Sequence, residues 1–134
     1  MPKVASLDTN LVVQLLVTRE YPEISEAVVR AIEANQMTHL ADLAITESVF
    51  VLSKHYRIER KAIAGFFRAL FKNPRINCNV SLFNKAFDYF INHPALSFED
   101  CCLVAYAELN NASPLLTNDR TLAKQLPHAE LIKA

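Results

Sequence analysis

The sequence predicts an α/β fold in which helices cover both faces of a central parallel sheet of about five strands, a three-layer α/β/α arrangement. Short apolar runs alternate along the chain with helical patterns of about 10–15 residues. The runs are apolar throughout, as is typical of strands that are buried on both sides. With 134 residues, 51% of them hydrophobic, the chain has the size and composition of one compact domain, expected to span residues 1–134.

The first half of the chain predicts two strands, each followed by helical segments. Residues 4–7 predict a buried strand, and residues 11–17, apolar nearly all round, predict a buried helix or turn. Pro22 is expected to begin an amphipathic helix because its fixed backbone angle suits the first helical turn. A second strand is expected over residues 37–41, followed by a helix that Asp42 caps and that runs to about residue 56. The predicted core face of the Pro22 helix comprises Ile24, Ala27, Val28, Ala31 and Ile32.

The second half continues this alternation. A helix is expected from about Glu59 to the Asn73–Pro74 pair, because proline cannot continue a helix. Ser81 and Ser97 each precede an apolar helical pattern and are expected to start helices. The remaining predicted elements are strands at 75–80, 115–117 and 131–132 and a short helix at 121–126. The predicted core positions are Ile63, Phe66, Phe67, Leu70, Phe71, Leu82, Phe83, Ala86, Phe87, Phe90, Leu103, Val104 and Ala107.

The composition excludes several functional classes. Fourteen Lys and Arg balance fourteen Asp and Glu, so a polyanion must be bound by a local patch rather than by bulk charge. A single glycine excludes phosphate loops built on several glycines. Three cysteines without CxxC spacing indicate a reduced, cytosolic chain. No apolar run approaches the roughly 20 residues of a membrane span, and the start of the chain lacks a signal peptide, so we expect a soluble cytoplasmic protein.

Four acidic residues follow, or lie close to, the carboxyl ends of predicted strands. Asp8 ends the first strand, and Asp119 comes two residues after the strand at 115–117. Glu47 and Asp100 lie in the first turns of predicted helices. Because ligands of parallel sheets bind at the carboxyl ends of the strands, we expect the four carboxylates to converge there. No His or Cys accompanies them at ligand spacing, and an all-oxygen set suits Mg²⁺ or Mn²⁺ in phosphodiester hydrolysis.

Each acid also has a purely structural interpretation. Asp8 would begin an Asx turn, Asp100 would complete a capping box with Ser97, and Asp119 would cap the last short helix. Glu47 would be an ordinary helical glutamate. A cap contributes about 1 kcal/mol, whereas two carboxylates ~5 Å apart repel by roughly 3 kcal/mol at an effective dielectric constant near 20. Several converging acids are therefore costly unless a cation neutralises them.

Four segments carry a family resemblance: residues 7–11 (LDTNL), 46–52 (TESVFVL), 98–105 (FEDCCLVA) and 115–120 (LLTNDR). In this order they resemble the four blocks of the PIN domain family, most closely the VapC-type toxins of bacterial and archaeal toxin–antitoxin pairs. The resemblance covers essentially the whole chain, and it implies a PIN-like fold with a five-stranded parallel sheet. The opening Asp-Thr-Asn after the first strand is its most specific part.

The resemblance implies a cytoplasmic endoribonuclease that requires Mg²⁺ or Mn²⁺. Asp8, Asp100 and Asp119 would bind the cation, and Glu47 would bind it or orient the attacking water. The supporting residues would be Thr9, Asn10 and Thr117. VapC-like proteins usually form homodimers and are held by a cognate antitoxin protein that reaches into the acidic pocket.

Two departures from the family pattern leave an alternative open. Family members often carry a further Asp where this chain has Ser97, and another where it has Thr121. The alternative is a catalytically weak or inactive module of the same fold that binds RNA or a protein. A small phosphohydrolase with Asp8 as covalent nucleophile is a third interpretation, weakened because Asn10 breaks the acid-x-acid arrangement of such enzymes.

Half of the cationic residues lie within residues 54–75 and predict a surface that binds RNA phosphates. The candidates nearest the acids in sequence are Lys54, Arg57, Arg60 and Lys61, followed by Arg68, Lys72 and Arg75. The alternative is a solvated helix face whose long stems cover apolar surface. Six phenylalanines at helical spacing predict core or dimer interface rather than base-stacking surfaces: Phe66, Phe67, Phe71, Phe83, Phe87 and Phe90.

Overall fold

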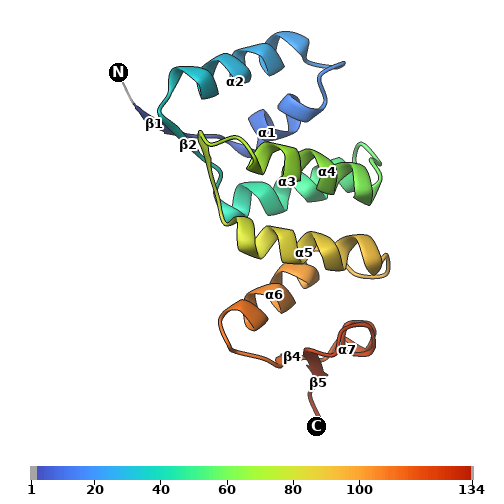
Figure 1. Ribbon diagram of the computed structural model, residues 1–134. Coiled ribbons are helices and arrows are strands. Elements are labelled where there is room, and N and C mark those ends of the chain that lie inside the picture. Colours follow the sequence, from blue (N-terminus) through green and yellow to red (C-terminus); the bar gives the residue numbers. More distant parts are fainter. Residues whose placement is uncertain (1–2, 134) are drawn as a thin grey trace. The chain divides into compact units, whose positions relative to one another are not determined.

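The computed structural model describes residues 3–133 as seven helices and five strands (Figure 1). The chain divides into two compact units, Met1–Asn79 and Val80–Ala134, each described below by itself. All strand pairs in both units are parallel. The predicted α/β class with parallel sheet is therefore confirmed.

The first unit holds a three-stranded parallel sheet with the order β1-β2-β3. Figure 1 shows β1 and β2 side by side near the N-terminus. Helix α1 packs on both α2 and α3, and α3 packs on α4. The elements are β1 (Val4–Ser6), α1 (Thr9–Leu16), α2 (Pro22–Ala34), β2 (Met37–His39), α3 (Asp42–Lys54), α4 (Arg60–Phe71) and β3 (Ile76–Asn77).

Helix α2 begins at Pro22 as predicted, but its buried face differs from the predicted one. The buried residues are Ser25, Val28 and Ile32. Three predicted core residues, Ile24, Ala27 and Ala31, are exposed instead. The hydroxyl of Ser25 donates a hydrogen bond to the backbone oxygen of Leu15 in α1, at 3.4 Å. A small polar residue therefore occupies the contact between the two helices, which an apolar periodicity cannot reveal.

The start of α3 differs from the prediction, whereas α4 begins where the sequence predicts. Ala41, not Asp42, is the N-cap of α3, and Asp42 is its first helical residue. Helix α4 follows Glu59, which is its N-cap. Of the predicted α4 core, Ile63 and Phe67 are buried. The other predicted members, Phe66, Leu70 and Phe71, are only half-buried.

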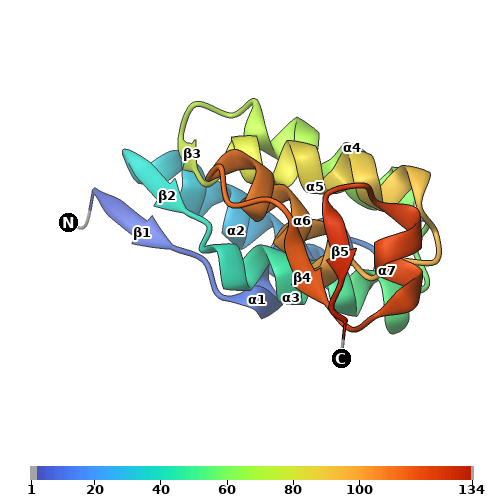
Figure 2. The same ribbon diagram turned by 90° about the horizontal axis from the view of Figure 1, so that it is seen from below.

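The second unit contains two helices followed by a small β-α-β segment. Its elements are α5 (Val80–Asn92), α6 (Phe98–Leu109), β4 (Leu115–Thr117), α7 (Arg120–Gln125) and β5 (Ala129–Leu131). Figure 2 shows the parallel strands β4 and β5 side by side.

The predicted core of α5 is confirmed in full: Leu82, Phe83, Ala86, Phe87 and Phe90 are all buried. Phe98 joins this group, with its ring centroid 4.7 Å from that of Phe87 and 5.2 Å from that of Phe90. In α6, Val104 and Ala107 are buried as predicted, but Leu103 is 52% exposed.

The prediction of one sheet of about five strands was wrong in one respect. Five strands are present in residues 3–133, but they are hydrogen-bonded as a three-stranded sheet and a separate two-stranded sheet. The strand expected at residues 75–80 shortens to Ile76–Asn77 because α5 already begins at Val80. A two-residue strand offers few backbone groups to a further neighbour.

Replacing Thr38 by valine should leave the free energy of unfolding unchanged or raise it by up to about 1 kcal/mol. Thr38 lies in the central strand β2 and is 1% exposed, and its hydroxyl has no hydrogen-bond partner among the described residues. The substitution removes an unpaired buried hydroxyl at nearly constant volume. Urea denaturation measures the change. Thr46→Val is the control, because the Thr46 hydroxyl donates to the Asp42 carbonyl oxygen at 2.9 Å. A Thr38→Val protein less stable than the control would contradict this account.

Candidate functional site

Asp8 stands at the junction between β1 and α1. Its backbone is extended, and its carbonyl oxygen accepts the first amides of α1, from Leu11 at 3.0 Å and Val12 at 3.2 Å. Within residues 3–133 its side chain makes no capping hydrogen bond, although Asp8 occupies the N-cap position. Asp8 therefore lacks the side-chain bond to a following amide that the Asx-turn interpretation requires. Its exposed carboxylate lies two residues after the parallel strand β1 and is available to a ligand.

A hydrogen bond joins the start of α1 to the second turn of α3. The hydroxyl of Thr9 donates to Oε2 of Glu47 at 2.9 Å. Thr9 is the residue after Asp8, so the fold brings the N-terminus of α1 beside Glu47, 38 residues away in the sequence. The bond also restricts the orientation of the glutamate side chain. Thr9 thus supports one of the predicted acids directly.

Asp100 lies in the first turn of α6, where Ser97 is the N-cap. The hydroxyl of Ser97 accepts the backbone amide of Asp100 at 3.1 Å. This is the predicted cap from serine, and it gives Ser97 a structural role at the position where the resemblance expects an acid. The side chain of Asp100 is half-buried.

Asp119 occupies the corresponding position between β4 and α7, and here the predicted cap is present. Its Oδ1 accepts the amide of Leu122 at 3.1 Å, and its own amide donates to the hydroxyl of Thr117 at 3.0 Å. Thr117 thus fixes the backbone that carries Asp119. Like Asp8, Asp119 comes two residues after a parallel strand and precedes a helix. The cap engages one carboxylate oxygen and leaves Oδ2 outside it.

The two units divide the predicted acids between them. Asp8 and Glu47 belong to the first unit, and Asp100 and Asp119 belong to the second. Among the residues from 3 to 133, no group of three His, Cys, Asp or Glu side chains that could hold a metal ion is found. Mg²⁺ commonly binds through one or two carboxylates together with water. The carboxylate and hydroxyl oxygens present in each unit suit that chemistry and lack the nitrogen or sulfur ligands that zinc prefers.

The predicted RNA-binding residues surround the turn between α3 and α4. Lys54 is the last residue of α3, Arg57 lies in the turn, and Arg60 and Lys61 begin α4. Lys54, Arg57 and Lys61 are exposed, and Arg60 is half-buried. Lys54 is seven residues after Glu47, which places it on the same face of α3 about 10 Å further along the axis.

Arg57 has an unusual backbone, with φ at 53°. A left-handed conformation costs a non-glycine residue about 1 kcal/mol. Positions with positive φ more often carry Gly or Asn. The presence of arginine at one of them indicates that its charge has a function.

The cysteines do not resemble catalytic nucleophiles. Burial raises the pKa of the Cys78 thiol to about 11, with the nearby charge of Asp42 adding to the effect. A thiol with this pKa stays protonated near neutral pH and is a weak nucleophile. Cys101 is buried, and the three cysteines form no disulfide in the described structure.

Sequence reasoning missed two features. The first is the near-buried carboxylate of Glu108, whose side chain is 11% exposed. A glutamate near a helix C-terminus interacts unfavourably with the helix dipole. The position of Glu108 at the end of a predicted helix could therefore have indicated that its carboxylate has a stabilising partner. The second is the exposed apolar pair Leu43 and Phe50, at 69% and 61% exposure, which share a face of α3 with Glu47. Because α3 is apolar nearly all round, its pattern did not show which side remains in solvent.

Comparison with known families identifies a match that covers most of the chain. The model of the PIN domain family matches residues 5–125, a span that includes all four acids and parts of both compact units. No curated protein matches the sequence. Within residues 3–133, no helix combines the length and apolar character needed to cross a membrane.

Proposed function

Because this chain belongs to the PIN domain family, generally a nuclease fold, we propose that it is a divalent-metal-dependent endoribonuclease. The reaction is hydrolysis of RNA phosphodiester bonds, and the biological role is that of a VapC-like toxin. The observation that supports the proposal is the hydrogen bond from the Thr9 hydroxyl to Glu47. Thr9 directly follows Asp8, whose carboxylate makes no capping bond among the described residues, and the bond restrains the orientation of the Glu47 carboxylate.

The cation is Mg²⁺ or Mn²⁺, and the oxygen donors fit either ion. It is held, directly or through water, by Asp8, Asp100 and Asp119. The whole chain, residues 1–134, forms one domain. When bound, the ion neutralises charge on the phosphoryl oxygens and makes water a stronger nucleophile at neutral pH.

The chain's own side chains orient the reactants. Thr9 donates a hydrogen bond to Oε2 of Glu47, whereas Oε1 accepts none from the other described residues. Oε1 is therefore the oxygen that would accept a hydrogen bond from the attacking water. Thr117 and the α7 cap restrain Asp119, and its Oδ2, which takes no part in the cap, would bind the cation. Asn10, exposed in the first turn of α1, supports the water around Asp8.

A panel of structured and single-stranded RNAs incubated with Mn²⁺, Mg²⁺ or EDTA tests this function. We expect cleavage with either ion and none with EDTA. Filter binding on the same RNAs in EDTA reports binding separately. If the folded protein binds RNA but cleaves none of it with either ion, the binding-only alternative replaces the nuclease.

The turn between α3 and α4 binds the RNA phosphates through Lys54, Arg57, Arg60 and Lys61. Replacing Arg57 by glycine should weaken RNA binding severalfold and reduce the salt slope of log K by about 0.7, the value for one phosphate of a single strand. The same change should leave the protein equally stable or stabilise it by up to about 1 kcal/mol, because glycine tolerates positive φ.

Asn111→Gly is the matched control for Arg57→Gly. Asn111 is the other residue with positive φ in the part of the chain that the structure describes, at 54°, and it carries no charge. Its replacement should leave the RNA affinity and the salt slope unchanged. A weaker affinity in both variants would show that the Arg57 charge does not bind phosphate.

A homodimer and a cognate antitoxin complete the proposed assembly. Leu43 and Phe50 on α3, and Leu103 and Tyr106 on α6, expose more than half of their side-chain surface. Exposed apolar groups at neighbouring turns favour a protein partner. Three cysteines that form no disulfide in the described structure fit the reducing cytoplasm, where such a toxin would meet its RNA.

Replacing Phe50 by glutamate should convert the dimer to a monomer, because it places a charge in an apolar interface. Analytical ultracentrifugation measures the molecular mass directly. Val29→Glu, at a 41% exposed position of α2, is the control and should remain dimeric. A Phe50→Glu protein that dimerises as well as the parent would place the interface elsewhere.

A further inference from the structure

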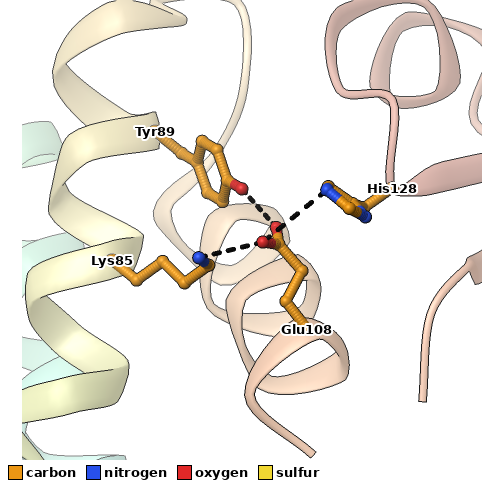
Figure 3. Close-up of polar contacts among 4 residues, drawn as sticks. All are labelled: Lys85, Tyr89, Glu108 and His128. Carbon is orange, nitrogen blue, oxygen red and sulfur yellow. Dashed lines mark hydrogen bonds and ion pairs between the residues drawn. The ribbon is translucent and has the colours of Figure 1, made fainter. Parts of the chain in front are cut away.

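Four side chains of the second unit form a polar cluster around one carboxylate (Figure 3). Glu108, near the end of α6, receives a hydrogen bond from the Tyr89 hydroxyl, and its Oε2 lies 3.0 Å from Nζ of Lys85. The Nε2 atom of His128 lies 3.8 Å from the same oxygen, too far for a hydrogen bond, and forms an ion pair with it when the imidazole is protonated. These four residues, the Glu108 cluster, link α5, α6 and the residue before β5.

The cluster keeps Glu108 ionised. Burial alone would raise the pKa of its carboxyl, but the hydrogen bonds from Tyr89 and Lys85 and the Lys85 charge together lower it below the ordinary 4.5. Burial and the neighbouring carboxylate raise the pKa of Tyr89, so its hydroxyl remains a donor. The carboxylate therefore stabilises the fold above pH 4.5, and this contribution is lost as the pH falls through the lowered pKa.

A continuous series of contacts connects the cluster to Asp119. The carbonyl oxygen of His128 accepts the amide of Leu115, the first residue of β4, at 2.7 Å. Strand β4 ends at Thr117, whose hydroxyl accepts the amide of Asp119. Asp119 in turn caps α7 through Leu122. His128 is thus connected, through the three residues of β4, to Asp119, a predicted metal ligand.

The segment that carries Asp119 depends on such contacts. Helix α7 has six residues, and a helix of this length is not stable in isolation. A second polar contact holds its other end, where Nδ1 of His93 lies 2.9 Å from Oε1 of Gln125. The buried side chains Leu122 and Leu126 supply the apolar part of the attachment.

We propose that Glu108 is a positioning residue: through His128 it fixes the β4–α7–β5 segment on α6 and thereby sets the position of Asp119 relative to Asp100. Glu108 and Asp100 lie on the same helix, eight residues and about 12 Å apart along its axis. The helix fixes one acid, and the cluster fixes the segment that carries the other. This inference rests on the proposed function for its catalytic consequence, because a shift of about 1 Å in a reacting group can cost about 100-fold in rate.

His128→Gln and Glu108→Gln test the proposal together. His128→Gln removes only the link to the segment and leaves the contacts of Lys85, Tyr89 and Glu108 in place. Amide hydrogen exchange then reports on the segment without metal or RNA. We expect the amides of Leu122 and Ala123 to exchange at least tenfold faster in both variants, and that of Phe87 in α5 to be unchanged. Glu99→Gln, the same change at an exposed site of α6, should match the parent.

Two further readouts separate positioning from general stability. Mn²⁺ affinity should fall about 10–100-fold, as is usual when support around a ligand is lost. The kcat for RNA cleavage should fall while KM stays constant, because the RNA-binding turn is untouched. Normal exchange at Leu122 in both variants overturns the proposal, as does faster exchange with unchanged Mn²⁺ affinity. A parent protein that neither binds Mn²⁺ nor cleaves RNA refutes the nuclease instead, and the Leu122 exchange result still decides whether the cluster positions Asp119.

Discussion

Replacing Asp8 by asparagine is expected to reduce RNA cleavage by at least about 100-fold, the usual scale for losing one group that stabilises charge in a transition state. The substitution keeps the shape of the side chain but removes the charge that holds the cation. Because the Asp8 side chain makes no capping bond among the described residues, α1 loses no hydrogen bond. Stability should therefore stay close to that of the parent.

The comparison for Asp8→Asn is Asp88→Asn, the same chemical change at an exposed residue of α5. Initial rates on one cleavable RNA, with Mn²⁺ well above saturation, should be normal in Asp88→Asn and lost in Asp8→Asn. Thermal unfolding should show both variants folded. A folded Asp8→Asn protein that cleaves at the parental rate would remove Asp8 from the active site.

Replacing Phe87 by alanine is expected to destabilise the protein by about 3–5 kcal/mol, the range for a large buried aromatic residue. Phe87 is fully buried in the second unit, and its ring contacts those of Phe90 and Phe98. Truncation leaves a cavity that these neighbouring rings cannot fill without moving. Chemical denaturation measures the loss, and Phe87→Leu should cost distinctly less because it retains most of the buried volume.

Ile24→Ala is the control for Phe87→Ala. The sequence placed Ile24 in the core, but the structure leaves it 36% exposed, so its truncation should cost no more than about 1 kcal/mol. If Ile24→Ala were as damaging as Phe87→Ala, the buried face of α2 would be the predicted one after all.

The parts of the fold that sequence predicted well are those where apolar periodicity and burial coincide. Helix α5 has its five predicted core residues buried, and Pro22 begins α2 as its backbone angle requires. Prediction failed where a polar residue packs between helices, as Ser25 does, or where a helix is apolar on several faces, as at Leu103. The division of the strands into two sheets depends on which distant backbones meet, and local pattern does not contain that information.

The candidate site was likewise predicted only in part. Chain position relative to the strands was enough to nominate Asp8 and Asp119, since both follow parallel strands by two residues. The roles differ, however, because only Asp119 uses its side chain as a cap within the described structure. The bond from Thr9 to Glu47 and the cluster around Glu108 join residues that are 19 or more positions apart, so no spacing rule indicated them.

The proposed function requires both Asp8 and Asp119 for binding of the cation, and Mn²⁺ binding in a mutant cycle tests this requirement most directly. The cycle compares the parent, Asp8→Asn, Asp119→Asn and the double variant by calorimetry. Asparagine caps helices as well as aspartate does, so Asp119→Asn changes charge without removing the cap of α7. We expect each single variant to lose the same high-affinity Mn²⁺ site and the double variant to lose nothing further. Independent losses that add in the double variant, or undiminished Mn²⁺ binding in either single variant, would contradict a shared site.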